Sequence, residues 1–97
     1  MYYNERVQYM KTIRWNLEKA KLIQEMRNID FERIATMINN SHIYKIMDVP
    51  NRINQKMFVL DYDGYAVCVP FFITENEIFI KTVYRSRKCT KMLRGKV

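Results

Sequence analysis

The dipeptide Asp63-Gly64 stands between two strongly apolar segments, and no other feature of the sequence constrains the fold as much. Asp-Gly is a preferred pair for tight hairpin turns, because both central positions of such a turn need a left-handed backbone. The flanking segments 56–62 and 65–73 are rich in β-branched and aromatic residues, which favour strands. The sequence therefore predicts an antiparallel hairpin.

Further strands flank this hairpin on both sides. The segment 43–47 comes before it, and the segment 78–84 follows after a short polar turn. Strands joined by short turns pair as antiparallel neighbours, so we expect a meander. Pro70 has no backbone N–H to donate, so its position within 65–73 requires a bulge or a sheet edge.

A short strand and two helices are predicted before the meander. Residues 12–15 alternate between outward and inward side chains, as in a strand. Asn16 and Asp30 suit the N-cap positions of helices over 17–27 and 31–38. The second helix carries apolar residues at the i, i+3, i+4 and i+7 spacing of a buried face.

This order of segments predicts an α+β fold. The two helices form a hairpin that packs on one face of a twisted antiparallel sheet of about four strands. A chain of 97 residues suffices for one domain and not for two, so we expect a single domain over 1–97. Residues 1–11 are expected to form a loose arm, and residues 91–97 a mobile basic tail.

The net charge of the chain is concentrated near its C-terminal end. The formal net charge is +7, from 17 basic and 10 acidic residues. Residues 77–97 hold seven of the basic residues and one acidic residue, so the rest of the chain is nearly balanced. Such an excess indicates an anionic partner, either nucleic acid or an acidic protein surface.

The last predicted strand continues into this basic region, over residues 78–88. Alternation then places Lys81, Val83, Arg85 and Arg87 on one side, with a repeat of roughly 7 Å that is close to the phosphate spacing of a nucleic-acid strand. On the other side an aromatic ring can stack on a base and hydroxyls can contact phosphate. The candidates on that side and beyond it are Thr82, Tyr84, Ser86, Lys88, Thr90 and Lys91.

Other interpretations of this segment stay open. A basic C-terminal end is often only a solvated end, and the same face can dock on an acidic partner protein. The single histidine, His42, is more often a surface or cap residue than a catalyst, and a histidine-pair nuclease is excluded. Asp61 and Asp63 are typical of turn chemistry. No metal site and no cofactor site is predicted.

The two cysteines and the apolar runs bear on the compartment. Cys68 and Cys89 lie 21 positions apart and form no metal-binding or redox motif, so a reduced cytoplasmic setting is expected. The longest apolar run covers residues 65–73 and is too short to span a bilayer. The N-terminus lacks the pattern of a signal peptide, so we expect no membrane partner.

Four blocks, in the same order along the chain, resemble the BrnT-like toxins of bacterial type II toxin–antitoxin systems. Residues 12–21 resemble their F-x-W-D-x-x-K opening, with Asn16 in place of the acidic residue, and residues 28–33 are similar to the start of their second helix. Residues 49–60 resemble a Pro-Asn block found in one branch of such toxins, and residues 79–91 resemble its closing block around Ser-Arg-Lys.

This resemblance implies a RelE-like fold and a cytoplasmic endoribonuclease that cleaves mRNA, free or on the ribosome, and arrests translation. A co-encoded antitoxin of ribbon-helix-helix or helix-turn-helix type would neutralise it. Cleavage by the RNA 2′-hydroxyl needs no metal, only proton transfer and cations that stabilise charge at phosphorus. We assign phosphate binding to Lys81, Arg85 and Arg87. Proton transfer or base stacking falls to Lys88 and Tyr84, with His42 as a weaker candidate.

Overall fold

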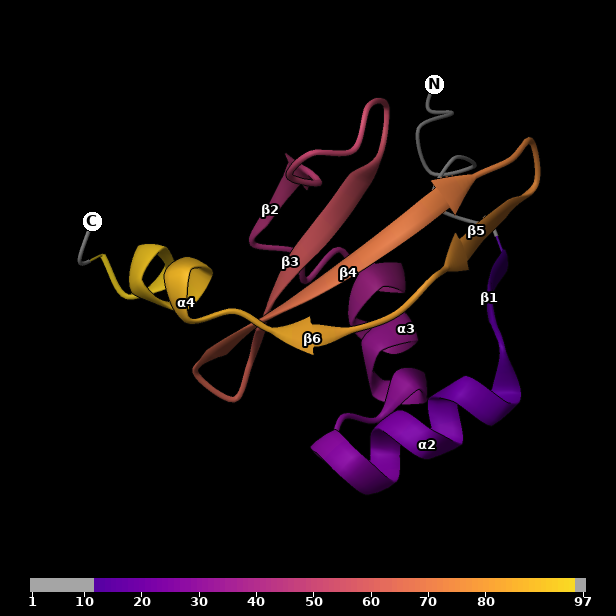
Figure 1. Cartoon of the computed structure of the whole chain (residues 1–97), viewed down its shortest axis with the longest axis horizontal. Coiled ribbons are helices and arrows are strands. Elements are labelled where there is room, and N and C mark those ends of the chain that lie inside the picture. Colours follow the sequence, from indigo (N-terminus) through magenta and orange to yellow (C-terminus); the bar gives the residue numbers. More distant parts are fainter. Residues whose placement is uncertain (1–11, 96–97) are drawn as a thin grey trace.

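The computed structural model describes residues 12–95, so the predicted arm over residues 1–11 and the last two residues of the predicted tail lie outside the described part. The described chain folds as an α+β structure, as expected (Figure 1). Its elements in chain order are β1 (Thr12–Trp15), α2 (Leu17–Arg27), α3 (Phe31–Asn39), β2 (Lys45–Asp48), β3 (Lys56–Tyr62), β4 (Tyr65–Ile73), β5 (Glu77–Ile80), β6 (Tyr84–Arg85) and α4 (Arg87–Leu93).

The predicted helical hairpin is present with the expected caps. The Asn16 side chain accepts a hydrogen bond from the backbone N–H of Lys19 at 2.9 Å, and Asp30 accepts one from Glu32 at 2.9 Å. These contacts satisfy backbone donors in the first turns of α2 and α3 that have no partner within the helix. The capping residues therefore fix where both helices begin.

The sheet has six strands and is mixed, which corrects the expectation of an antiparallel sheet of about four strands. Strands β2, β3, β4 and β5 form the expected antiparallel meander, with the Asp63-Gly64 hairpin between β3 and β4. However, β1 pairs in parallel with β5 at one edge, and β6 pairs with β4 beside β5. The alternation of side chains indicates a strand but does not say which neighbour it pairs with, so the position of β1 was not predictable.

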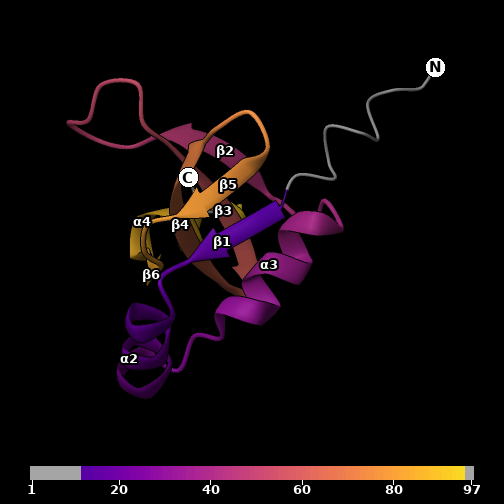
Figure 2. The ribbon, with the colours of Figure 1, turned by 90° about the vertical axis from the view of Figure 1, so that its right-hand side faces the viewer.

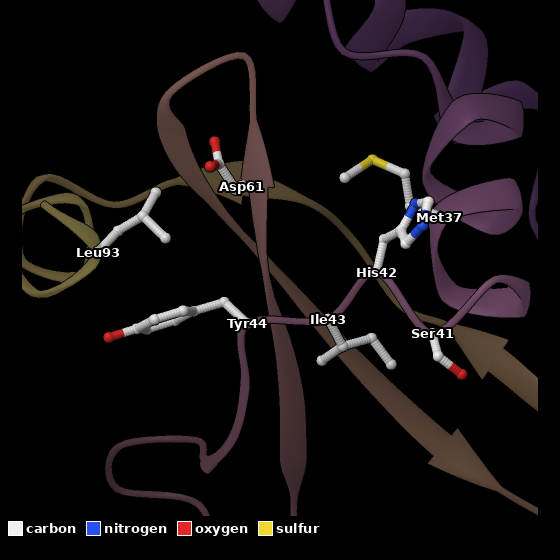
Figure 3. Close-up of a pocket in the computed structure, with 7 residues that line it drawn as sticks. All are labelled: Met37, Ser41, His42, Ile43, Tyr44, Asp61 and Leu93. Atoms are coloured by element: carbon white, nitrogen blue, oxygen red, sulfur yellow. The ribbon is translucent and has the colours of Figure 1, made fainter.

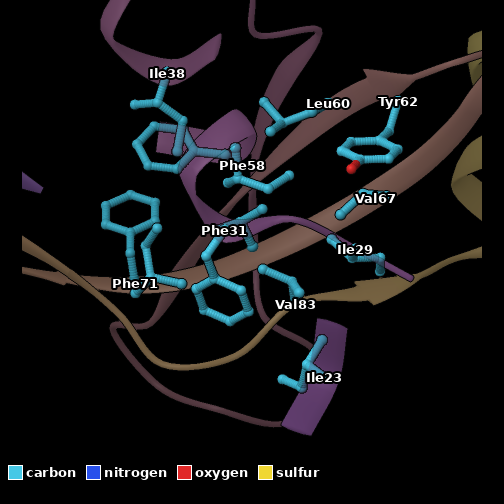
Figure 4. Close-up of a cluster of buried hydrophobic side chains, with 13 residues drawn as sticks. Ile23, Ile29, Phe31, Ile38, Phe58, Leu60, Tyr62, Val67, Phe71 and Val83 are labelled. Carbon is cyan, nitrogen blue, oxygen red and sulfur yellow. The ribbon is translucent and has the colours of Figure 1, made fainter. Parts of the chain in front are cut away.

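The main hydrophobic core lies between one face of the sheet and the helices α2 and α3. Phe58 and Phe71 stack in it with ring centroids 4.1 Å apart (Figure 4). Ile34 from α3 is fully buried in the same core. From α2 only Ile23 is buried, with Ala20 partly buried beside it, so this helix contributes a narrow apolar face to the core. Both helices thus cover one face, as predicted.

A register shift divides the predicted last strand into β5 and β6. Ile80 pairs with Phe71 and Tyr84 pairs with Cys68, so the three residues 81–83 oppose the two residues 69–70. One extra residue on one strand is the definition of a β-bulge. The bulge lies opposite Pro70, whose carbonyl accepts from the backbone N–H of Lys81 at 2.9 Å but which has no N–H to return. Pro70 was expected to require a bulge or a sheet edge, and a bulge is present, on the strand opposite it. The expectation of a continuous strand over 78–88 was wrong.

The second face of the sheet is covered by α4, which the sequence did not predict. A smaller core of Met57, Val59, Ala66, Cys68 and Cys89 lies between α4 and the strands. Figure 2 shows α3 and α4 on opposite sides of the sheet. Residues 91–93 belong to this helix, so the expectation of a mobile tail was wrong for them. None of the helices within residues 12–95 is long and apolar enough to span a membrane.

Candidate nucleic-acid interface

Helix α4 has one face on the sheet and one cationic face. Cys89 and Thr90 are buried against the strands, whereas the basic side chains are exposed or lie at the helix end. At about 100° per residue, the basic side chains fall within an arc of about 120° on the side opposite the sheet. We call this surface the cationic face; it consists of Arg87, Lys88, Lys91 and Arg94.

The cationic face has no acidic counterpart in the described structure. The three ion pairs recorded among residues 12–95 join Arg14 to Glu77, Arg33 to Asp63 and Lys56 to Asp48. None of them involves a residue of α4, and the sequence has no Asp or Glu after Glu77. Arg94 donates to the Gly64 carbonyl, but the positive charges of the face carry no ion pair there and are open to an external anion.

Two hydrogen bonds to Ala66 attach the start of α4 to β4, and a helix cap fixes where the helix begins. One is a backbone bond, from the Ser86 N–H to the Ala66 carbonyl at 3.0 Å. Thr90 is 4% exposed, and its hydroxyl accepts from the backbone N–H of Ala66 at 2.8 Å and donates to the Ser86 carbonyl at 2.6 Å. The Ser86 hydroxyl caps the helix by accepting from the backbone N–H of Cys89 at 3.0 Å. Both hydroxyls were predicted to contact phosphate, but the structure uses them to hold the helix that presents the cations.

The predicted row of Lys81, Arg85 and Arg87 does not form, because the bulge turns the strand by one residue. Arg85 pairs with Val67 and so lies on the α2 side of the sheet, where its guanidinium donates to the Arg27 carbonyl. Lys81 lies on the opposite side, with its ammonium 4.8 Å from the centroid of the Phe72 ring. Of the three predicted phosphate ligands, only Arg87 is part of the cationic face.

Arg85 is also engaged in a reciprocal contact that ties α2 to the bulge. Arg27, the last residue of α2, donates from Nη1 to the Val83 carbonyl at 2.7 Å, and Arg85 donates to the carbonyl of Arg27. A cation near the C-terminal end of a helix is favourable, because the last carbonyls have no partner within the helix. The geometry gives Arg85 a clear structural role.

Tyr84 is half-buried in the smaller core and Thr82 is half-buried at the bulge. The Tyr84 hydroxyl contacts the Met57 sulfur at 3.6 Å. Burial raises the pKa of Tyr84 above its ordinary value, with the neighbouring thiols adding to the effect. A raised pKa keeps the phenol protonated near neutral pH, so Tyr84 is poorly suited to accept a proton.

The two cysteines, which showed no motif in the sequence, lie side by side in the smaller core. Their sulfur atoms are 3.9 Å apart, and both thiols are free and buried. Burial and the neighbouring Cys89 thiol raise the pKa of Cys68 to about 12. No spacing rule links positions on β4 and α4, so only the packing of α4 could reveal the pair.

A pocket of about 410 Å³ opens beside the C-terminal turn of α4 (Figure 3). It brings together His42, a predicted candidate, with Tyr44 and Asp61, which the sequence reasoning had not placed in a site. Met37, Ser41, Ile43 and Leu93 complete its lining. The Tyr44 hydroxyl donates to the Met92 carbonyl at 3.3 Å, so the ring is linked directly to α4. Asp61 retains its predicted turn role, because its Oδ1 accepts from the backbone N–H of Gly64 at 2.7 Å.

Within residues 12–95, no group of three or more His, Cys, Asp or Glu side chains is arranged to hold a metal ion. A second hollow of about 290 Å³, lined by Ile13, Arg14, Trp15 and Leu17, contains one charged side chain.

Comparisons with protein-family models, with curated proteins and with solved structures found no match for this chain.

Proposed function

We propose that this protein binds RNA through the cationic face of α4. The observation that carries the proposal is that Arg87, Lys88, Lys91 and Arg94 share one helix face without an acidic partner in the described structure. Cations that neutralise phosphates release counterions, and this release supplies most of the sequence-independent affinity for nucleic acid. A surface of this kind contacts the RNA backbone rather than its sequence.

The attachment of α4 to the sheet favours binding through an ordered helix over binding through a mobile tail. The Thr90 hydroxyl and the Ser86 backbone N–H both bond to the backbone of Ala66 on β4, so the side chains of the helix start from a fixed backbone. Binding to an ordered surface loses less conformational entropy than binding that must first order a flexible segment. The helix therefore favours a specific docking surface over a merely solvated C-terminal end.

We further propose that the bound RNA is mRNA and that the protein cleaves it as a cytoplasmic toxin with a RelE-like fold. The resemblance to BrnT-like toxins is what supports this step, together with the order of a strand, a helical hairpin and a meander. Cleavage then proceeds by attack of the RNA 2′-hydroxyl on the adjacent phosphorus, which forms a 2′,3′-cyclic phosphate, breaks the P–O5′ bond and releases the next nucleotide with a 5′-hydroxyl. The proton of the 2′-hydroxyl leaves and the 5′-oxygen takes one up, while Arg87 and Lys88 stabilise charge at phosphorus. An antitoxin with an acidic surface would neutralise the toxin by covering the same helix face.

The binding step is tested by charge variants that are matched in net charge. The double variant Arg87→Gln/Lys91→Gln removes two cations from α4, and Lys19→Gln/Lys21→Gln removes two exposed cations from α2. Fluorescence anisotropy with a labelled single-stranded RNA should show a loss of roughly ten-fold or more in affinity for the first variant only. Equal losses in both would assign binding to net charge alone, and equal affinity for single-stranded DNA of the same sequence would overturn the preference for RNA.

The cleavage step is tested separately. RNA incubated with the wild-type protein in EDTA, with and without ribosomes, should yield fragments, and Arg87→Gln/Lys91→Gln should yield fewer. Binding without any fragments in either condition rejects the enzyme and leaves an RNA-binding or partner-binding protein. Growth arrest on expression, compared between wild type and the same variant, extends the test to the cell.

A further inference from the structure

We propose that the pocket formed by His42, Tyr44 and Asp61 receives one base of a single-stranded RNA whose phosphates lie on the cationic face. This inference rests on the proposed RNA binding and adds to it a site that reads a base. The pocket was not part of the predicted interface, because its residues come from α3, from the loop before β2, from β3 and from the end of α4.

Tyr44 offers the surface on which a base can stack. The residue is 45% exposed, and its hydroxyl donates to the Met92 carbonyl at 3.3 Å. An exposed ring that is fixed at its far end presents a face at little entropic cost. Single-stranded RNA is commonly recognised by stacking of unpaired bases on aromatic side chains of this kind.

The remaining lining of the pocket fits a flat, partly polar ring. In Figure 3, Tyr44 and Leu93 lie on one side of the pocket and His42 and Met37 on the other, with Asp61 above them. One Asp61 oxygen is occupied by the Gly64 N–H, and the other has no recorded partner among the described residues. That oxygen can accept a hydrogen bond from an N–H on the base edge, as carboxylates do in nucleic-acid recognition. The volume of about 410 Å³ lies within the range of small-ligand sites.

The pocket lies beside the last turn of α4, which also carries cations of the cationic face, and this proximity selects RNA as the occupant over a small metabolite. Leu93 lines the pocket from α4, one residue before Arg94 and two after Lys91. The Arg94 guanidinium donates to the Gly64 carbonyl at 3.1 Å, which places it at the turn that Asp61 also caps. A base in the pocket therefore has cations of the last helical turn beside it for its flanking phosphates.

The test compares a short single-stranded RNA with the same strand carrying abasic positions. Wild-type protein should bind the intact strand roughly ten-fold more tightly, which corresponds to the usual effect of one stacked base. Tyr44→Ala should lose this preference, whereas Tyr44→Phe should keep most of it because the ring remains. Ile53→Ala, an exposed apolar residue beyond the opposite end of β3, serves as the control and should behave as wild type. Circular dichroism checks that each variant is folded.

The outcomes separate the pocket from the cationic face. If Arg87→Gln/Lys91→Gln weakens binding but wild type does not distinguish the intact strand from the abasic strand, the pocket inference is overturned and the proposed RNA binding stands. A preference that persists in Tyr44→Ala places the base elsewhere and also overturns the inference. If wild type binds neither strand, the proposed function fails and the inference fails with it.

Discussion

Thr90 is the position at which the attachment of α4 can be tested with one substitution. Its hydroxyl accepts from the Ala66 N–H and donates to the Ser86 carbonyl, and both Thr90 and Ala66 are buried. Thr90→Val keeps the shape of the side chain but leaves the Ala66 N–H buried without a partner, at a cost of about 1–3 kcal/mol. Thr90→Val also removes the hydrogen bond from the Thr90 hydroxyl to the Ser86 carbonyl. Because this carbonyl keeps its bond from the Thr90 backbone N–H, that removal costs less, about 0.5–1.5 kcal/mol.

We therefore expect Thr90→Val to lower the free energy of unfolding by about 1.5–4.5 kcal/mol; the midpoint of about 3 kcal/mol corresponds to roughly 12–24 °C in Tm for a domain of this size. Urea denaturation measures the first quantity, and hydrogen exchange at the Ala66 amide shows whether α4 detaches before the rest of the fold. RNA affinity should fall in parallel, because the cations lose their fixed backbone.

The matched control is Thr36→Val on α3. The Thr36 hydroxyl also donates to a backbone carbonyl, that of Glu32 at 3.0 Å, but it is exposed and leaves no buried donor behind. This variant should stay within about 0.5 kcal/mol of wild type. A Thr90→Val protein as stable as the Thr36→Val protein, with unchanged RNA affinity, would refute the anchoring of α4 through this hydroxyl.

Three further predictions concern charge and ionisation. Plotted against the logarithm of the salt concentration, the logarithm of the RNA association constant should fall with a slope of about −3 if four cations contact phosphates. The variant Arg87→Gln/Lys91→Gln should reduce that slope by about half. Fluorescence anisotropy in a salt series measures both slopes. Folding raises the pKa of Cys68 from 9.0 to about 12, so the unfolded state releases this proton at a lower pH than the folded state. The free energy of unfolding should therefore decline as pH rises from about 9 towards 12. Denaturation at several pH values should show a weaker decline for Cys68→Ala. The hydrogen bond from Arg33 holds the pKa of Asp63 below its ordinary value of 3.8, so this contribution to stability should be lost as pH falls below that value; Asp63→Asn should flatten the acid limb of the stability curve.

Local signals in the sequence predicted much of the fold. The caps Asn16 and Asp30 determined where α2 and α3 begin, and Asp63-Gly64 determined the central hairpin. Each of these features acts over a few residues, through a side chain that satisfies a nearby backbone group or a turn that tolerates a left-handed backbone. The partner of β1 depends on packing across the whole chain, and no local pattern encodes it.

The candidate site was less predictable, because a single proline changes the register beside it. Pro70 signalled a bulge, but the sequence did not say that the extra residue lies on the opposite strand. That residue reverses the side to which Arg85 points, and with it the predicted row of cations. The basic composition of α4 concealed its helical pattern, since Cys89 and Thr90 are weak signals of a buried face.

Some residues that are distant in the sequence lie close together in the fold. His42, Tyr44 and Asp61 meet at the end of α4, and Cys68 meets Cys89 beneath it. Once α4 is placed on the second face of the sheet, both groupings follow from that placement. The docking of one short helix therefore accounts for most of what the sequence did not predict about the site.

A titration of the ¹⁵N-labelled protein with a short single-stranded RNA, followed by NMR, tests directly whether α4 is the RNA-binding element. We expect the backbone amide shifts to change most over residues 86–94, with a second group of changes at residues 41–44 and 61–64. Shifts that instead concentrate on the exposed side of α2, or that leave residues 87–94 unchanged while RNA binds, would contradict the proposed interface.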